Sequence, residues 1–253
     1  MAEKKDRINE IGYNNNGERM IIVRYGGATD IDVQFDDGTI IKNRTYGDFK
    51  KGRIKNPMTP SVFGIGFIGV GDYKTSDGNG KNTKCHAVWS SMHQRCYDPK
   101  YHEKRPTYKN CKVCKEWNNY NEFGKWFDDN YYEVGDERME LDKDILCKGN
   151  KVYSPTTCVF VPQSINSLFT KCDNERGNLP IGVHKHGNKF VAQLRKGNGK
   201  RIHLGTYDTP EEAFFAYKKA KEAYIKEVAE EYKGKIDNRL YEALMNYEVE
   251  ITD

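Results

Sequence analysis

Short runs of alternating apolar and polar residues dominate the N-terminal part of the chain. Residues 20–23, 31–35 and 39–41 alternate in this way, which places every second side chain on one face of a β-strand. Between the second and third runs, the Asp-Asp-Gly sequence at 36–38 is typical of a hairpin turn. The pattern predicts a small all-β barrel over residues 17–72.

The first module shows no distinctive chemistry, so its role stays open. Pro57 and Pro60 end the alternating region, and the module is similar to Tudor-like barrels. One interpretation is a spacer, or a docking module for an unidentified partner protein. The alternative is weak contact with DNA through a basic run, which consists of Lys50, Lys51, Arg53 and Lys55.

A polar, Gly-rich linker at residues 73–84 precedes a unit with helical spacing, 85–170. A helix is predicted from about residue 86 and a second one over 119–130. Residues 140–161 are then rich in β-formers, with a turn at 148–150. The apolar positions at helical spacing are Trp89, Met92 and Cys96 in the first helix and Tyr120, Phe123, Trp126 and Phe127 in the second.

Residues 177–236 have the pattern of three short strands and one long helix. An Asn-Gly pair at 198–199 marks a hairpin turn, and Thr209 and Glu212 form a capping box at the start of the helix. We expect a small-residue face to pack on the sheet, made of Ala213, Ala216, Ala220 and Ala223. Residues 237–253 are predicted to be a helical tail with no assigned role. The fold class is therefore α+β, with several domains.

The composition limits the cellular setting. Mean hydropathy is −0.88, and no apolar run approaches the roughly 18 residues of a membrane span, so no membrane partner is expected. The N-terminal residues lack the apolar stretch of a signal peptide, which predicts a cytoplasmic location. Seven cysteines in such a chain favour thiols or metal ligands over disulfides.

Positive charge is concentrated in the third unit. Between Arg176 and Tyr207 there are seven Lys and Arg residues and no acidic residue, whereas the whole chain has a net charge of only +4. Three of the six histidines also lie in this stretch. Such charge on short strands predicts a sheet that lies against the phosphates of double-stranded DNA.

The strand sequences are specific enough to indicate a family. The Gly-Val pair at 182–183, FVAQLR at 190–195, RIHLGTY at 201–207 and TPEEA at 209–213 closely resemble the APETALA2/ethylene-response-factor DNA-binding domain. In that family a three-stranded sheet enters the major groove and the helix braces it. The resemblance implies six groove-facing residues: His184, His186, Gln193, Arg195, Arg201 and His203. Histidines replace the usual Arg after Gly-Val and the usual Trp before Leu-Gly, so a weaker or different base preference is expected.

A second series of motifs lies in the middle unit. WxxMxxRCY at 89–97, CxxW at 114–117, LDK at 141–143 and YSPxxC at 153–158 are followed by Asn166. This order resembles phage-encoded HNH-like proteins, also called His-Me finger proteins, which often carry an APETALA2-like module. The resemblance implies a ββα-metal domain and, for a phage protein, a location in the bacterial host cytoplasm. Similar homing nucleases hold one divalent metal and activate water with a base on the first strand.

The catalytic positions depart from the family pattern. The usual Asp-His pair corresponds here to Asp142 and Lys143, and no histidine occurs between His102 and His184. The resemblance implies that Asp142 and Asn166 bind Mg²⁺ or Mn²⁺, which prefer oxygen ligands. The predicted catalytic set is Asp142, Lys143, Asp144 and Asn166.

Two details of this site stay open. Transfer of the proton is left to Asp144, Lys143 or His86, and the middle residue of the motif is Asn150 or Thr157. A simpler interpretation also exists for the carboxylates, because acidic residues outnumber basic ones nine to three between residues 118 and 146. In that case Asp142 and Asp144 belong to a solvated acidic surface.

Cys111 and Cys114 have the spacing of a zinc knuckle, although a structural zinc site needs four ligands. No second CxxC pair completes it, and the cysteines are alternatively small buried residues. Further potential ligands are Cys85, His86, Cys96, His102 and Cys158.

The sequence predicts a DNA endonuclease of the phage homing type, which docks DNA through its C-terminal sheet and hydrolyses a phosphodiester with a divalent metal. The first alternative is a DNA-binding protein that does not cut and acts as a regulator or site blocker. The second is a protein-binding inhibitor that reuses these modules. The sequence indicates no oligomeric state.

Overall fold

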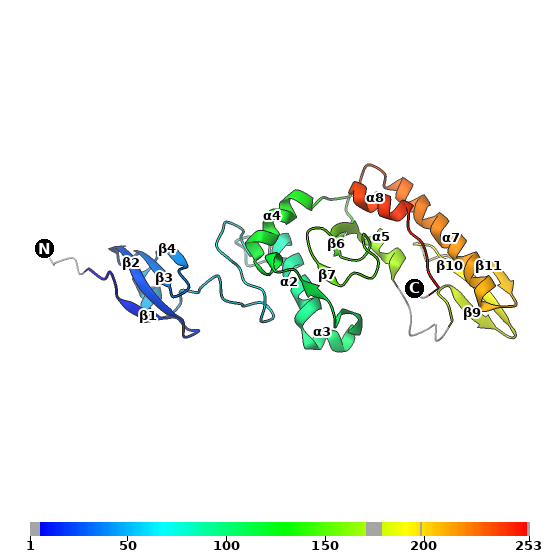
Figure 1. Ribbon diagram of the computed structural model, residues 1–253. Helices are drawn as coiled ribbons and strands as arrows, with labels where there is room; N and C mark the ends of the chain where they lie inside the picture. Colours follow the sequence, from blue (N-terminus) through cyan, green and yellow to red (C-terminus); the bar gives the residue numbers. More distant parts are fainter. Residues whose placement is uncertain (1–5, 171–178, 198, 252–253) are drawn as a thin grey trace. The chain divides into compact units, whose positions relative to one another are not determined.

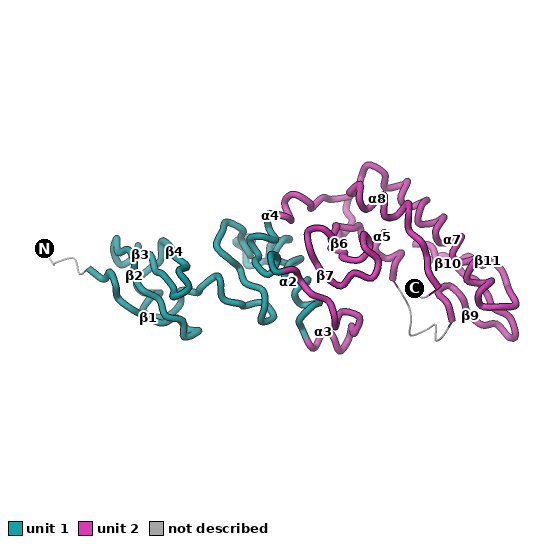
Figure 2. Tube along the Cα trace, viewed as in Figure 1, with its two compact units in different colours: residues 1–98, 115–124 teal, residues 99–114, 125–253 magenta. Residues whose placement is uncertain are grey.

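The computed structural model describes residues 6–170, 179–197 and 199–251, which form a mixed α and β structure as expected (Figure 1). The chain divides into two compact units (Figure 2). Unit 1 comprises residues 1–98 and 115–124, and unit 2 comprises residues 99–114 and 125–253.

Unit 1 begins with an antiparallel sheet in the order β1-β2-β3-β4. The turn predicted at residues 36–38 joins β3 to β4, with Gly38 at φ 87°. The barrel expectation was wrong, because β1 and β4 each pair with one neighbour and the described sheet stays open. The bounds of these strands are β1 (Ile11–Tyr13), β2 (Arg19–Gly27), β3 (Asp30–Phe35) and β4 (Ile40–Arg44).

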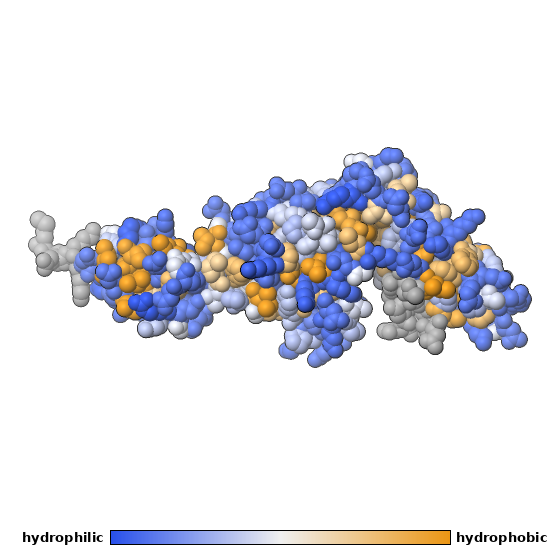
Figure 3. All heavy atoms as spheres, viewed as in Figure 1, coloured by the Kyte–Doolittle hydropathy of each residue, from blue (hydrophilic) through white to orange (hydrophobic). Residues whose placement is uncertain are grey.

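A short helix explains why this sheet needs no closure. Phe49 of α1 (Tyr46–Lys50) and the following Ile54 are buried in the same core as the inward-facing strand residues. They cover the apolar face that a barrel would enclose. Other apolar side chains stay outside, including Ile11 and Tyr13, and Figure 3 shows hydrophobic atoms over this sheet. The buried strand residues are Met20, Ile22, Ile31, Val33 and Phe35.

The polar side chains of this sheet form ion pairs with one another. Arg24 Nε lies 2.8 Å from Asp32 Oδ2, and Arg24 Nη2 lies 2.5 Å from Asp30 Oδ1. Arg19 Nη1 is 2.7 Å from Asp36 Oδ1. Two arginines of β2 are therefore matched by carboxylates of this sheet and its turns.

The remainder of unit 1 packs around α2 (Lys84–Tyr97), whose N-cap is Thr83. Trp89 is fully buried and donates its indole N–H to the carbonyl of Trp117, at 2.6 Å, in η2 (Glu116–Asn118). The backbone of Gly66 lies against Trp89, where a Cβ would come within 2.9 Å of the ring. Gly66 thus allows close packing of its backbone on Trp89. The segment predicted as a linker contains a bridge between Ser76 and Asn82.

In unit 2, a strand pair and a short helix follow α4 (Tyr120–Asn130), which begins in unit 1. Strand β6 (Met139–Asp142) pairs antiparallel with β8 (Val159–Pro162), and α5 (Gln163–Asn166) follows directly. The long connection between β6 and β8 contains the turn predicted at residues 148–150, with Gly149 at φ 80°. The other elements are α3 (Pro99–Lys104), η1 (Pro106–Tyr108), η3 (Ser167–Phe169), and the parallel pair β5 (Lys112–Val113) and β7 (Val152–Tyr153).

The three predicted C-terminal strands and their helix are present. The sheet has the order β11-β10-β9, and Thr209 and Glu212 form the predicted capping box. Asn198 of the predicted turn lies outside the described residues, while Gly199 donates its N–H to the Lys196 carbonyl at 2.9 Å. Ala223 is exposed, so the small-residue face is shorter than predicted. The bounds are β9 (Val183–His186), β10 (Lys189–Arg195), β11 (Arg201–Tyr207) and α7 (Pro210–Glu231).

Helix α7 belongs to two hydrophobic cores. Its N-terminal half packs on the three-stranded sheet through Phe214 and Tyr217. Its C-terminal half, which includes Ile225 and Val228, shares a core with β8 and α5. Between them, the buried ammonium of Lys221 donates to the carbonyl of Leu168 in η3, at 2.7 Å.

The C-terminal segment has a clear structural role. Leu240 and Leu244 of α8 (Asn238–Met245) are fully buried in the core shared with β8 and α5. Val249 is buried in the core of the three-stranded sheet. The tail predicted to have no role therefore contributes to both of the cores that α7 shares.

Candidate active site and DNA-contacting sheet

Asp142 lies at the end of β6 and organises the turn that follows it. Its Oδ1 accepts hydrogen bonds from the backbone N–H groups of Asp144 and Ile145, at 2.8 and 2.7 Å. Burial, assisted by the charge of Asp144, raises the pKa of Asp142 above its usual value. A raised pKa favours the protonated acid. A cation beside Asp142 would oppose this effect and favour the carboxylate.

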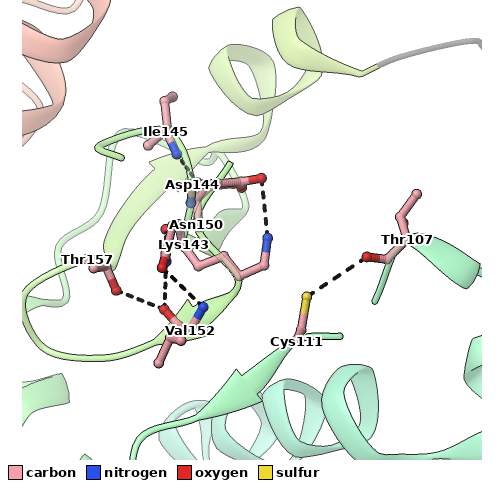
Figure 4. A network of polar contacts seen from close by, with 9 residues as sticks. Thr107, Cys111, Lys143, Asp144, Ile145, Asn150, Val152 and Thr157 are labelled. Carbon is pink, nitrogen blue, oxygen red and sulfur yellow. Dashed lines mark hydrogen bonds and ion pairs between the residues drawn. The ribbon is translucent and has the colours of Figure 1, made fainter. Parts of the chain in front are cut away.

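Lys143 points away from solvent into a polar network (Figure 4). Its Nζ lies 3.3 Å from Asp144 Oδ2 and 5.8 Å from the ring centroids of Tyr108 and Tyr153. Burial by itself lowers the pKa of Lys143, but the negative charge of Asp144, together with Cys111, outweighs it and the pKa is raised. A lysine with a raised pKa remains an ammonium at neutral pH, which argues against a general-base role.

Asn150 and Thr157 hold the connection between β6 and β8 in place. Asn150 Nδ2 donates to the carbonyls of Lys143 and Val152, both at 2.7 Å, and its Oδ1 accepts from the Val152 N–H at 3.2 Å. Thr157 Oγ1 donates to the same Val152 carbonyl at 2.9 Å (Figure 4). Both side chains are engaged in the loop, so this geometry favours a structural role for them.

Asn166 approaches a carboxylate that the sequence interpretation missed. Its Nδ2 donates to Glu140 Oε2 at 2.5 Å, and Arg138 Nε lies 3.6 Å from the other oxygen of Glu140. Because side chains alternate along a strand, Glu140 and Asp142 lie on the same face of β6. That alternation was the available signal. By taking up the amide nitrogen, Glu140 leaves Asn166 Oδ1 as the atom available to a cation.

A pocket of about 640 Å³ brings three of the four predicted catalytic residues together. Asp142, Asp144 and Asn166 line it, while Lys143 lies behind its wall. Two further lysines, Lys148 and Lys151, also line this pocket. The remaining lining residues are Tyr108, Ile145, Gly149, Phe169, Thr170, Tyr247 and Glu250.

The pocket is lined by oxygen-bearing side chains of the kind that bind divalent cations. Among the described residues, no three His, Cys, Asp or Glu side chains gather closely enough to hold a metal by themselves. Mg²⁺, however, is commonly bound through one or two carboxylates, water and substrate phosphate. Asp142, with one oxygen free of the turn hydrogen bonds, and the amide oxygen of Asn166 satisfy that requirement.

The cysteines form no zinc cluster in the parts of the chain that the structure covers. Six of the seven are described, and none of these six forms a disulfide. Burial raises the pKa of Cys111 and raises that of Cys158 to about 12, which disfavours the thiolate that zinc needs. Zinc binding by Cys111 and Cys114 stays a prediction. His86 belongs to unit 1, where its ring packs against Trp89 and Tyr120, at centroid distances of 5.8 and 5.3 Å.

All six predicted groove-facing residues share one face of the C-terminal sheet. In the strand register, Gln193 is opposite His203 and Arg195 is opposite Arg201. On the other side of β10, His184 is opposite Val191 and His186 is opposite Lys189. Odd-numbered residues of β10 project to one side and even-numbered ones to the helix side, where Ala192 and Leu194 are buried against α7.

The two arginines of this outer face are exposed. Within residues 6–170, 179–197 and 199–251, no carboxylate lies within ion-pair distance of Arg195 or Arg201. Lys189, by contrast, pairs with Asp208. The outer face therefore presents two guanidinium groups whose charge is not neutralised by the described residues, at adjacent positions on neighbouring strands.

Comparisons of the chain with protein-family models, curated proteins and solved structures found no match. Among the helices of the described residues, none combines the length and the apolar composition that crossing a bilayer requires.

Proposed function

We propose that the protein is a metal-dependent DNA endonuclease of the HNH-like type, which docks double-stranded DNA on its C-terminal sheet. The observation that carries the proposal is the pocket in which Asp142, Asp144 and Asn166 meet. It lies in the same compact unit as the arginine-bearing sheet face. A site for phosphodiester chemistry and a surface for DNA are thus parts of one unit.

The order of elements supports this proposal. Strands β6 and β8 and helix α5 occur in the order of the two strands and helix of a ββα-metal domain, with β7 in the connection between the two strands. The order of β9, β10, β11 and α7 is that of an APETALA2-like domain. The motifs of the APETALA2-like resemblance occupy β9, β10, β11 and the start of α7. Of the HNH-like motifs, LDK at 141–143 begins on β6 and Asn166 ends α5, whereas WxxMxxRCY at 89–97 lies in α2 of unit 1.

In the proposed site, Asp142 and Asn166 would hold Mg²⁺ or Mn²⁺. Such an ion neutralises phosphate charge and promotes the ionisation of water. Glu140 orients the Asn166 amide, and Lys143 holds Asp144 at the pocket wall. Asp144 is the candidate proton acceptor, because it lines the pocket as a carboxylate while Lys143 is a cation.

The test is cleavage of supercoiled plasmid and phage genomic DNA with Mg²⁺, Mn²⁺ or EDTA. Asp142→Ala and Asn166→Ala should each lower metal-dependent cutting by about 100-fold or more, because each removes a metal ligand. Asp136→Ala is the matched control, since Asp136 is an exposed carboxylate outside the pocket. Equal cutting by all four proteins would show that the pocket is not the active site.

A second candidate function is DNA binding without cleavage. It is favoured by the absence of any histidine between His102 and His184, which leaves the pocket without an imidazole base. In that case no DNA is cut with any metal, yet binding remains steeply salt-dependent. Four to six phosphate contacts predict a log–log slope of about −4 to −5.

A further inference from the structure

The C-terminal segment lies against a lysine of the candidate active site. Lys148 Nζ donates to the Glu248 carbonyl at 3.1 Å and lies 3.6 Å from Glu250 Oε1. The same ammonium is 5.3 Å from the ring centroid of Tyr247. Lys148, Tyr247 and Glu250 all line the pocket that contains Asp142, Asp144 and Asn166.

One side of the pocket therefore carries the ammonium of Lys148 with the carboxylate of Glu250 beside it. The carboxylates of Asp142 and Asp144 repel a phosphodiester, so a substrate phosphate needs cations in the same pocket. Lys148 and Lys151 are the two lysines that line it. Glu250 places a carboxylate on Lys148, and a carboxylate offers an ammonium the same kind of charged oxygen as a phosphate.

The segment is fixed, but the Glu250 side chain is exposed. Val249 is buried, its carbonyl accepts from Lys218 Nζ at 2.7 Å, and its N–H donates to Glu222 Oε1 at 2.9 Å. The side chains of Lys148 and Glu250 are 37% and 59% exposed. An ion pair this exposed is weak, and rotation of one side chain breaks it without moving the backbone.

We propose that Lys148 is a phosphate-binding residue of the pocket and that Glu250 is an internal competitor, which the DNA phosphate displaces from Lys148. This inference rests on the proposed function. Glu250 then lowers the affinity of the pocket for a DNA phosphate. DNA that is also bound elsewhere, as on the sheet face, displaces Glu250 more efficiently than DNA that contacts the pocket alone.

The test uses the full chain and a double-mutant cycle on Lys148 and Glu250, with binding to a double-stranded DNA fragment measured across a salt series. Glu250→Gln should tighten binding about two- to fivefold. Lys148→Gln should weaken it about fivefold and reduce the salt slope by about 0.9, the value of one phosphate contact. In the double variant, the gain from Glu250→Gln should vanish.

Glu248→Gln is the matched control, because it removes the same charge two residues away, where only the backbone carbonyl contacts Lys148. Equal tightening by Glu248→Gln and Glu250→Gln, or a gain from Glu250→Gln that persists without Lys148, would overturn the inference while leaving the proposed function intact. Failure of the wild-type protein to bind DNA in low salt would overturn both.

Discussion

The two larger antiparallel sheets of the described residues differ in how the arginines on their strands are paired. Each sheet buries one face under a helix, α1 in unit 1 and α7 in unit 2. On β2 of the first sheet, Arg24 is held by Asp30 and Asp32. On the second sheet, Arg195 and Arg201 face outward with no described carboxylate partner.

The difference shows why a count of basic residues is a poor guide to a DNA-binding surface. A guanidinium that is already paired must lose its carboxylate before it contacts a phosphate, whereas an unpaired one exchanges only water and counterions. The basic run of unit 1 is also partly matched, since Lys50 lies 3.6 Å from Glu10 and Arg53 lies 3.9 Å from Asp48. This difference in pairing supports the proposal that the second sheet, and not the first, is the surface that binds DNA.

The largest effect that follows from this comparison is on DNA affinity. Replacing both Arg195 and Arg201 by alanine should weaken binding by about 100-fold or more and reduce the salt slope by about 2, because two phosphate or base contacts are lost. The measurement is a salt series with double-stranded DNA.

The control for this variant is Lys219→Ala, which removes an exposed charge from α7 rather than from the sheet face. Its affinity should change by less than about twofold. If Lys219→Ala weakened binding as much as the arginine substitutions, net charge rather than the sheet face would govern docking.

A smaller effect concerns the free energy of unfolding. Helix α7 packs on its sheet and also forms a hydrogen bond to η3 through Lys221. Burial lowers the pKa of Lys221 to about 8, below its unfolded value of about 10.4. Between these pH values the unfolded chain binds more protons, so this group makes the free energy of unfolding rise with pH. Relative to Lys221→Met, wild type should gain about 1–2 kcal/mol between pH 8 and 9.5.

Urea unfolding of both proteins at several pH values measures this difference, and all other titrating groups cancel in the comparison. Identical pH dependence in wild type and Lys221→Met would mean that Lys221 is not buried as the structure places it.

The smallest expected effect concerns Arg24. Arg24→Ala should leave DNA affinity unchanged within about twofold, since this guanidinium is engaged by carboxylates. It should lower the midpoint of urea unfolding, because Asp32 is buried and loses its partner. Loss of DNA affinity with unchanged stability would reverse the contrast between the two sheets.

Local signals in the sequence predicted most of the secondary structure. The capping box at Thr209 and Glu212 and the turn at residues 36–38 depend only on neighbouring residues, so their chemistry can be read directly. The six C-terminal sheet residues follow from the family resemblance, and the strand register places them on one face. Asp142 and Asn166 also follow from a resemblance, and the structure brings both to one pocket.

Features that depend on distant segments could not be predicted. Glu140 and Asn166 are 26 residues apart, and their contact exists only because β8 pairs with β6. Whether a sheet closes depends on what covers its apolar face, which here is Phe49. Ala223 follows the spacing of the small-residue face, yet it is exposed and lines a surface hollow with Phe215 and Lys219 on another side of α7.

The shared helix α7 also determines when the protein can finish folding during synthesis. The core around β8 and α5 stays incomplete until Ile225, Leu240 and Leu244, which come far later in the chain, have left the ribosome. The sheet core likewise waits for Val249. A ribosome that has completed the candidate catalytic residues therefore still carries an unfinished core around them. The pocket, which Tyr247 and Glu250 also line, forms only after the three-stranded sheet has been synthesised.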